Sequence, residues 1–451
     1  MSGYAEYREV NLPWLKAVPA HWEIRRNKNI FTEQKEIVGE RSADYTLLSL
    51  TLNGIIPRDM DGGGKFPESF DKYKIVKNGD MAFCLFDIDE TPRTVGLSGY
   101  NGMLTGAYTI MRVSNINARF IYYYYLALDN GKMLRPLYTG LRKTININTF
   151  QSTKVPFPPR EEQDQIVRFL DWKVSSINKL INIKKKEIKA IDALKRSTVS
   201  HAITRGLTAN APMKYSGVKW LGDIPQRWYT VPLYAIAQVK SINNCIDLPL
   251  MSVYLDAGVV PFVEREEKRT NATSKDLTNY QRVDPGDFVL NNQQAWRGSV
   301  GVSFHSGIVS PAYIVLSLNN TLDSHYASYL FRSRCMVDQY LVISRGVGSI
   351  QRNLYWSALK RVVVPIPSKK EQMEIVEYLD GLNNKFDATI KKLTEEVAVL
   401  EEYKNKIIAD TVTGKIDVRG IEIPEYEFVD EDNDNVDENL EQGADEPPKE
   451  E

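Results

Sequence analysis

Two long stretches of the chain carry apolar side chains at steps of three and four residues, the spacing that lines one side of an α-helix. One runs from about residue 162 to 204 and the other from about 371 to 412. At 1.5 Å per residue, each helix would be roughly 60 Å long. The apolar positions are Leu170, Val174, Ile177, Ile181, Ile188, Ile191 and Val199 in the first stretch, and Leu379, Leu382, Phe386, Ile390, Leu393, Val397, Leu400 and Ile407 in the second.

A helix with such a stripe needs a partner surface, because it is unstable alone in water. The two stretches have nearly equal lengths, which favours mutual burial of their stripes in an antiparallel coiled coil. Lys184 and Lys195 interrupt the first stripe. Since each helix follows its own globular segment, antiparallel packing would place the two segments at opposite ends. The alternative, two unrelated core helices, leaves the equal lengths unexplained.

The globular segments before the two helices are similar to each other, with a period near 206 residues. Tryptophans and a proline recur at identical spacing, and a Gly-Asp pair recurs between apolar runs. An alternating run then predicts a strand, and an aromatic run predicts a helix. The matched pairs are Trp14-Leu15 with Trp220-Leu221, Pro19 with Pro225, Trp22 with Trp228, Gly79-Asp80 with Gly286-Asp287, TIMRV with IVLSL, and RFIYYYYLAL with HYASYLFRSR.

Helix start and stop signals divide the chain into parts. Prolines and then Glu-Gln precede each long helix, in VPFPPREEQ and VVPIPSKKEQ, and a glycine that can cap a helix ends each one, in ITRG and TVTG. These signals predict globular domains at 1–160 and 207–369, helices at 161–206 and 370–414, and a C-terminal tail at 421–451.

Charge is distributed unevenly along the chain. The formal net charge is −1, but residues 421–451 hold 14 acidic residues against one basic residue, so the first 420 residues carry about +12. That excess suits a polyanionic partner such as nucleic acid. The tail is too poor in apolar residues to form a core. We therefore expect it to be disordered and solubilising rather than autoinhibitory.

The order of these duplicated motifs resembles that of the specificity subunits of type I restriction-modification systems. The resemblance covers the chain up to about Gly420. Each motif is weak alone, but the duplicated order, with a long helix after each copy, is specific. The matching residues are Pro19-Ala20-His21-Trp22 and Pro225-Gln226-Arg227-Trp228, then Gly79-Asp80 and Gly286-Asp287, and finally Pro156, Pro158 and Glu162-Gln163 with Pro365, Pro367 and Glu371-Gln372.

The resemblance implies an α/β (α+β) fold with two pseudo-repeated target recognition domains, whose curved sheets are separated by two long antiparallel coiled-coil helices. It implies double-stranded DNA as a partner, with each domain reading one half of a bipartite site. Such subunits bind two adenine methyltransferase (M) subunits and can recruit restriction (R) subunits that combine a motor and a nuclease. The chain itself would be non-catalytic and cytoplasmic. Because the two segments differ greatly between landmarks, the half-sites should differ.

Reading of base edges needs forked donors and acceptors on loops held by a rigid scaffold. Residues 87–93 and 139–144 of the first segment qualify, as do residues 291–298 and 344–353 of the second. The acidic residues of the first loop are expected to orient Arg93. The alternative is that all of these are solvated loop charges. The candidate DNA-binding residues are Arg93, Arg142, Lys143, Thr144, Asn292, Gln293, Gln294, Arg297, Arg345, Ser349, Gln351 and Arg352.

Polar residues open both long helices. We expect Glu162, Gln163, Glu371 and Gln372 to bind M subunits, which would give one equivalent site in each repeat. The alternative is that they only stabilise the helix starts through the helix dipole.

An enzyme is one alternative, but the cofactor loop and the flipped-base motif of a methyltransferase are both missing from the sequence. Asp256, Glu266 and Lys268 could superficially hold Mg²⁺ for a nuclease, yet the first segment lacks their counterparts. Scattered histidines and cysteines predict no metal, disulfide or cofactor. No apolar run is long enough to span a membrane. A coiled-coil interaction scaffold without sequence-specific DNA reading is the other alternative; strongly salt-dependent DNA affinity would argue against it.

Overall fold

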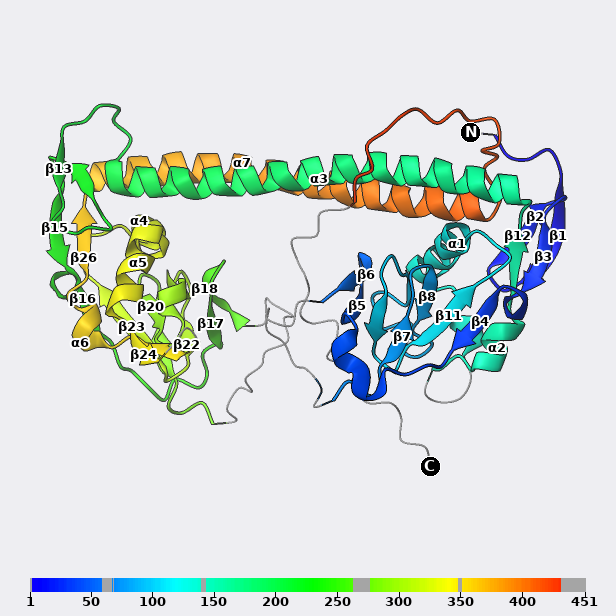
Figure 1. Cartoon of the computed structure of the whole chain (residues 1–451). Helices are drawn as coiled ribbons and strands as arrows, with labels where there is room; N and C mark the ends of the chain where they lie inside the picture. Colours follow the sequence, from blue (N-terminus) through cyan, green and yellow to red (C-terminus); the bar gives the residue numbers. More distant parts are fainter. Residues whose placement is uncertain are drawn as a thin grey trace. The chain divides into compact units, whose positions relative to one another are not determined.

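The computed structural model describes residues 2–58, 67, 69–138, 143–262, 276–347 and 351–430. The chain divides into two compact units (Figure 1). Unit 1 comprises Met1–Glu187 with Leu393–Glu451, and unit 2 comprises Ile188–Lys392. Each unit contains one globular segment and part of each long helix. The division between the units therefore falls within the two helices.

The two long helices are present as predicted. α3 spans Arg160–Arg205 and α7 spans Lys369–Val412, so their limits lie within two residues of the expected ones. Every predicted position of the two apolar stripes is buried or half-buried. In unit 1, Ile181 of α3 and Val397 of α7 belong to one core cluster. Because the first half of α3 packs with the last half of α7, the helices run antiparallel.

The two lysines that interrupt the apolar stripe form ion pairs with the other helix. In unit 1, Lys184 Nζ lies 3.1 Å from a carboxylate oxygen of Glu396. In unit 2, Lys195 Nζ lies 2.5 Å from Asp387 Oδ1. A long lysine can keep its stem on the apolar seam while its ammonium group reaches the edge, so neither lysine breaks the packing.

The globular part of unit 1 is built from short antiparallel strands and two helices. Its largest sheet has the order β4-β11-β8-β9. The two-stranded pairs are β1-β2, β3-β12, β5-β6 and β7-β10. The elements are β1 (Tyr7–Leu12), β2 (Leu15–Pro19), β3 (Glu23–Arg26), β4 (Phe31–Gln34), β5 (Leu48–Thr51), β6 (Gly54–Pro57), β7 (Lys74–Val76), β8 (Asp80–Phe83), β9 (Val95–Leu97), β10 (Gly102–Leu104), β11 (Thr109–Val113), α1 (Ala118–Asn130), α2 (Ile147–Ser152) and β12 (Lys154–Phe157).

The globular part of unit 2 has a four-stranded sheet of order β16-β23-β20-β21. As in the sheet of unit 1, the first strand of the sheet in chain order is followed by the last, the second and the third. It also has the pairs β13-β14, β15-β26, β17-β18, β19-β22 and β24-β25. The elements are β13 (Met213–Tyr215), β14 (Asp223–Pro225), β15 (Tyr229–Pro232), β16 (Ala237–Val239), β17 (Met251–Tyr254), β18 (Gly258–Pro261), β19 (Gln281–Val283), β20 (Phe288–Asn291), β21 (Val300–Val302), β22 (Gly307–Val309), β23 (Tyr313–Leu318), α4 (Ser324–Arg332), α5 (Arg334–Ile343), β24 (Arg345–Val347), β25 (Gln351–Asn353), α6 (Trp356–Leu359) and β26 (Val363–Ile366).

The repeated Gly-Asp motif forms a turn that leads into a central strand of each four-stranded sheet. Gly79 and Gly286 have φ angles of +88° and +92°, a backbone conformation that glycine adopts without steric cost. Asp80 Oδ2 accepts a hydrogen bond from the amide three residues earlier at 3.0 Å. Asp287 Oδ2 does the same at 2.8 Å. The motif therefore has a structural role in this protein.

Residues 421–430 correct our expectation that the whole acidic tail is disordered. They lie along α3 within unit 1, where three polar side chains of that helix bind their backbone. Ser175 Oγ accepts a hydrogen bond from the amide of Val429 at 2.8 Å. Asn178 and Asn182 donate to the carbonyls of residues 429 and 430, at 3.2 and 2.9 Å. An extended segment without a neighbouring strand needs such partners for its backbone groups. The rest of the tail is outside the described residues.

Candidate nucleic-acid interface

A tryptophan from the repeated motif is tied to the start of a long helix in each unit. Trp22 Nε1 donates to Glu162 Oε1 at 2.9 Å in unit 1. Trp228 Nε1 donates to Glu371 Oε2 at 2.9 Å in unit 2. Both indole rings are 1 % exposed. Each hydrogen bond therefore joins the beginning of a globular segment to the helix that follows it, across about 140 residues of sequence.

The neighbouring glutamines connect the same helix starts to α1 and α4. Gln163 Oε1 accepts from the amide of Asn117, the N-cap residue of α1, at 2.8 Å. Gln372 Oε1 accepts from the amide of Asp323, the N-cap residue of α4, at 2.7 Å. Both glutamine side chains also donate to a proline carbonyl at the end of the preceding strand region. Each Glu-Gln pair thus fixes the domain onto its helix.

These contacts bear on the expectation that Glu162, Gln163, Glu371 and Gln372 bind M subunits. All four side chains are buried within their own unit, with exposed fractions of 0–6 %. Tyr4 also donates a hydrogen bond to Glu162, and burial together with that carboxylate raises the pKa of Tyr4 far above its usual value. The four residues hold the fold together, so a partner that docks here would contact their exposed neighbours.

Arg93 is held differently from our expectation. Its Nη1 atom donates to Asp129 Oδ2 at 3.2 Å and to Asn130 Oδ1 at 2.8 Å. Its side chain is only 15 % exposed. Asp129 of α1 therefore orients Arg93. Two carboxylates of the loop at 87–93 pair with other residues: Asp89 Oδ1 accepts from Arg135 Nε at 2.6 Å, and Glu90 lies 3.5 Å from Lys143 Nζ.

The two candidate loops of unit 1 lie side by side. The amide of Ile145 donates to the carbonyl of Leu85 at 2.7 Å. Lys143, which is half-exposed and has a φ of +46°, lies 3.5 Å from the carboxylate of Glu90. Thr144, the next residue, is partly exposed. Arg142 is outside the described residues.

The two candidate loops of unit 2 are joined by a matching backbone contact. The amide of Leu354 donates to the carbonyl of Asn292 at 2.9 Å. The first loop is a tight turn in which Trp296 Nε1 donates to the carbonyl of Gln293 at 2.9 Å. The guanidinium group of Arg297 lies 4.6 Å from the centre of the Trp296 ring, and that of Arg352 lies 5.8 Å from it. Two loops about 55 residues apart therefore meet at one aromatic ring.

The second loop of unit 2 is a short hairpin of β24 and β25. Arg345 is paired with Asn353, and Gly346 is paired with Arg352. Arg345 is exposed, whereas Arg352 is half-buried beside Trp296. The side chain of Gln351 and all of Ser349 are outside what the structure describes. Gln293 is exposed and Asn292 and Gln294 are partly exposed on the neighbouring turn.

Two features of this surface were missed by sequence reasoning. Asp129, which holds Arg93, is the single acidic residue of the aromatic helix α1, but its spacing from Arg93 gives no signal. Trp296 was part of a candidate loop, but its contact with Arg352 depends on the fold.

The extended segment at 421–430, which lies along α3, was also missed. The alternating apolar and acidic residues of IEIPEYEFV would have predicted it.

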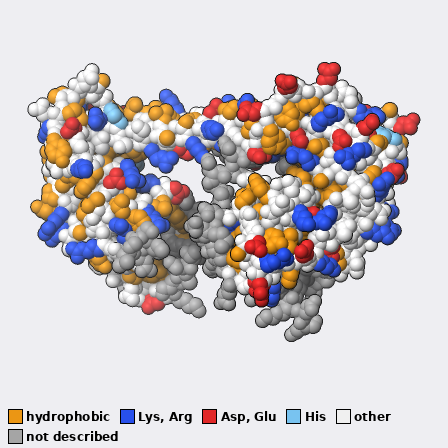
Figure 2. Space-filling view, in the orientation of Figure 1, with side chains coloured by type: hydrophobic (Ala, Val, Ile, Leu, Met, Phe, Trp, Pro, Cys, Tyr) orange, Lys and Arg blue, Asp and Glu red, His pale blue; other side chains and the backbone are white. Residues whose placement is uncertain are grey.

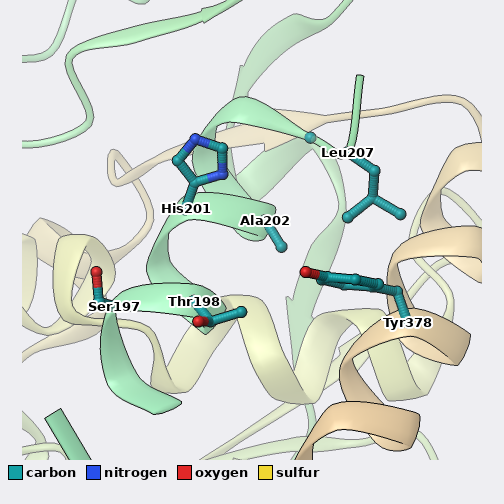
Figure 3. A pocket seen from close by; sticks show the side chains of 7 residues that line it. Ser197, Thr198, His201, Ala202, Leu207 and Tyr378 are labelled. Atoms are coloured by element: carbon teal, nitrogen blue, oxygen red, sulfur yellow. The ribbon is translucent and has the colours of Figure 1, made fainter. Parts of the chain in front are cut away.

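An open pocket of about 370 Å³ lies elsewhere in unit 2, at the end of α3 (Figure 3). His201 and Ala202 come from the last turns of α3, Leu207 follows it, and Tyr378 comes from α7. The pocket contains none of the candidate DNA-binding residues. Its lining offers no paired acid and base, so we assign no chemistry to it.

On the face seen in Figure 2, basic and acidic side chains are interspersed over both units. Within the ranges that the structure covers, no group of three histidine, cysteine or acidic side chains is arranged to hold a metal ion. Glu266 and Lys268, which were weighed as a metal site with Asp256, are outside those ranges. No helix in the described part of the chain is both long and apolar enough to cross a membrane.

Comparison with known proteins gives one consistent family. Residues 70–215 and 225–399 match the family model described as the type I restriction modification DNA specificity domain. The type I restriction enzyme MjaVIII specificity subunit of Methanocaldococcus jannaschii is 24 % identical over 441 residues, which covers 92 % of this chain and 98 % of the relative. The putative MjaX specificity subunit of the same organism is 25 % identical over 428 residues, covering 89 % and 95 %.

A solved structure shares the fold. A solved chain from work on complex assembly and conformational transition of the type I R-M system has a TM-score of 0.59 at 14 % identity, over 88 % of this chain and 99 % of that one. Since the two parts matched by the family model include most of the chain, the assignment does not depend on one motif. The chain belongs to the family of type I restriction-modification specificity subunits.

Proposed function

We propose that each unit of this protein reads one half of a bipartite site in double-stranded DNA, on behalf of a type I restriction-modification complex. The chain supplies recognition and no catalytic group. Two M subunits bound to it methylate adenine at the recognised site, and R subunits add cleavage in the full complex. The complex acts on DNA in the cytoplasm.

The observation that carries this proposal is the repeated link between two divergent loops. In unit 1 the link is the hydrogen bond from Ile145 to Leu85, and in unit 2 it is the one from Leu354 to Asn292. Each link brings two loops of unlike sequence together on a rigid sheet. Rigid scaffolds with variable loops are the usual means of reading different sequences with one fold. Two such surfaces in one chain fit two different half-sites.

The loops supply side chains of the right chemistry for base edges and phosphates. In unit 1 we propose Lys143 and Thr144 as contacts, and Arg142 with them. Arg93 serves the reading surface indirectly, because its guanidinium group is bound to Asp129. In unit 2 the proposed contacts are Asn292, Gln293, Gln294, Arg297, Arg345, Ser349, Gln351 and Arg352.

The M subunits are proposed to dock at the starts of the two long helices. In unit 1, Glu161 is exposed next to the buried Glu162, and Arg168 is exposed further along α3. Met373 and Tyr378 are 64 % and 44 % exposed beside Glu371 in unit 2. Exposed large apolar side chains are suited to a protein interface, which supports the site of unit 2, whereas the side chains named for unit 1 are charged. One docking site in each unit would give the expected pair of M subunits.

Methylation mapping tests this proposal. DNA from cells that produce the chain with the M subunit encoded beside it should carry methyladenine in one bipartite motif with a fixed unspecified spacer. Cells with either protein alone should lack the motif. If the motif is absent although the M subunit is active, the scaffold alternative replaces DNA reading. If the chain alone modifies or cleaves DNA, it is an enzyme.

A further inference from the structure

The starts of the two long helices offer different side chains to a partner. Tyr378 of α7 is 44 % exposed, whereas its counterpart in α3, Phe169, is fully buried. Met373 of α7 is 64 % exposed, whereas its counterpart in α3 is the charged Asp164. Two copies of one M subunit would therefore meet unlike side chains at the two helices.

We infer that residues 421–430 supply the missing apolar contact of unit 1, with Tyr426 and Phe428 as the side chains that an M subunit binds. The partner surface that fits them is an apolar groove with a basic rim. This inference rests on the proposed function and assigns the partner contact of one unit to a segment outside the repeat.

The segment is held on α3 through its backbone. Ser175 Oγ donates to the carbonyl of Glu427 at 3.0 Å and accepts from the amide of Val429 at 2.8 Å. Nearer the start of α3, Gln165 Nε2 donates to the carbonyl of Ile421 at 2.8 Å. These bonds satisfy backbone groups of the extended chain and fix its course. They do so without using the side chains that would meet a partner.

The side chains of the segment alternate between two faces, as they do in an extended chain. Ile421 and Ile423 pack against the core cluster of unit 1. Tyr426 and Phe428 occupy alternate positions of the other set, and they are 39 % and 51 % exposed. Single exposed apolar side chains are common on protein surfaces. Two aromatic side chains on one face of an immobilised segment are different, because they can bury a large area in a partner with little further ordering.

Acidic side chains around the aromatic pair define the chemistry of the partner. Glu422, Glu425 and Glu427 are exposed, and the ten residues of the segment include no lysine or arginine. Figure 2 shows acidic and hydrophobic side chains side by side along the upper edge of unit 1, where the segment runs in Figure 1. In unit 2, Tyr378 likewise follows an exposed glutamate, Glu377. Such a surface repels DNA and suits a protein groove with basic side chains at its rim.

The test is a titration of the full-length chain with the M subunit encoded beside it, followed by native mass spectrometry to count bound M subunits. Tyr426→Ala combined with Phe428→Ala should weaken one of the two binding steps by at least about tenfold, because aromatic anchors dominate protein interfaces. Replacing the three exposed glutamates by glutamine should slow association and reduce its dependence on salt. Tyr403→Ala is the matched control and should leave both steps unchanged, since Tyr403 is a 47 % exposed tyrosine of unit 1 on α7.

Met373→Ala combined with Tyr378→Ala separates the two units, because it should weaken the other binding step. The inference is overturned if the variant of Tyr426 and Phe428 binds two M subunits like the wild type, or if it loses affinity for DNA instead. Should hydrogen exchange show that this variant releases the segment from α3, the glutamine variant decides the question, and unchanged association would then overturn the inference. A wild-type chain that binds no M subunit would instead refute the proposed function itself.

Discussion

The indole nitrogen of Trp228 and the carboxylate of Glu371 are 2.9 Å apart, although 143 residues separate them in the sequence. Arg227 adds a second donor to the same carboxylate at 2.6 Å. Loss of one partner from a buried hydrogen-bonded pair leaves the other unsatisfied, which costs about 1–3 kcal/mol. This pair therefore anchors the globular part of unit 2 on α7.

Glu371→Ala should lower the free energy of unfolding of unit 2 by about 1–3 kcal/mol, since the Trp228 N–H would lose its acceptor in a buried site. Urea unfolding followed by tryptophan fluorescence measures the change. Glu377→Ala is the matched control, because Glu377 is exposed on the same helix. Equal stability of the two variants would refute a structural role for Glu371.

Gly414→Ala should destabilise unit 1 by at least about 1–2 kcal/mol, because Gly414 has a φ of +76°. A Cβ atom there would also lie 2.4 Å from Pro19 Cδ and 3.1 Å from the Trp22 ring. Gly420→Ala is the control, since a Cβ at Gly420 meets open space. Thermal unfolding of the two variants measures the difference. If both variants had the melting temperature of the wild type, the result would contradict this account.

Ser175→Ala should speed hydrogen exchange of the Val429 amide by about three- to tenfold, because Ser175 Oγ accepts its hydrogen bond at 2.8 Å. Hydrogen exchange with mass spectrometry measures this change in the peptide that contains residues 421–430. Ser176→Ala is the matched control, since Ser176 is exposed and its hydroxyl bonds within α3. Unchanged exchange in Ser175→Ala would mean that the segment is not held by this contact.

Stability of unit 2 should fall in acid through Asp284. Partial burial raises the pKa of its carboxyl group, but hydrogen bonds from Lys240 and Arg282 outweigh that effect and lower the pKa below 3.8. A lowered pKa stabilises the fold at pH values above 3.8, and this contribution is lost as the pH falls through the folded-state pKa. Lys240→Met should therefore be destabilised at pH 7 and less so at pH 3.

Unfolding midpoints in urea at the two pH values test this prediction. Lys214→Met is the control, because Lys214 is exposed. The account predicts that the loss of stability in Lys240→Met is smaller at pH 3 than at pH 7. An equal loss at the two pH values would contradict the assignment of the acid effect to Asp284. The pairing also involves Asp287, whose Oδ2 atom lies 2.5 Å from Lys240 Nζ.

The long helices were accessible from sequence because they depend on local periodicity. Leu170 and Leu379 have the spacing of a helix stripe, and both are fully buried. The apolar runs TIMRV and YIVLSL form β11 and β23, as predicted. Each strand buries two consecutive residues, so both of its faces are covered in the fold.

The functional surface could be predicted from the sequence only in part. The loops around Lys143 and Trp296 could be selected by residue type, but which residues pair depends on the folded chain. Glu162 illustrates the limit. Its place at a helix start suggested a partner contact, whereas the fold brings Trp22 to it from 140 residues away. Ion pairs such as Arg93 with Asp129 leave no trace in spacing.

The most direct test of the central claim is the exchange of residues 216–365 for the same part of a relative with a different site, followed by methylation mapping with the same M subunit. The account predicts a hybrid motif in which one half is new, while the other half and the spacer are unchanged. A change in both halves, or retention of the original motif, would contradict the claim that each unit reads one half-site.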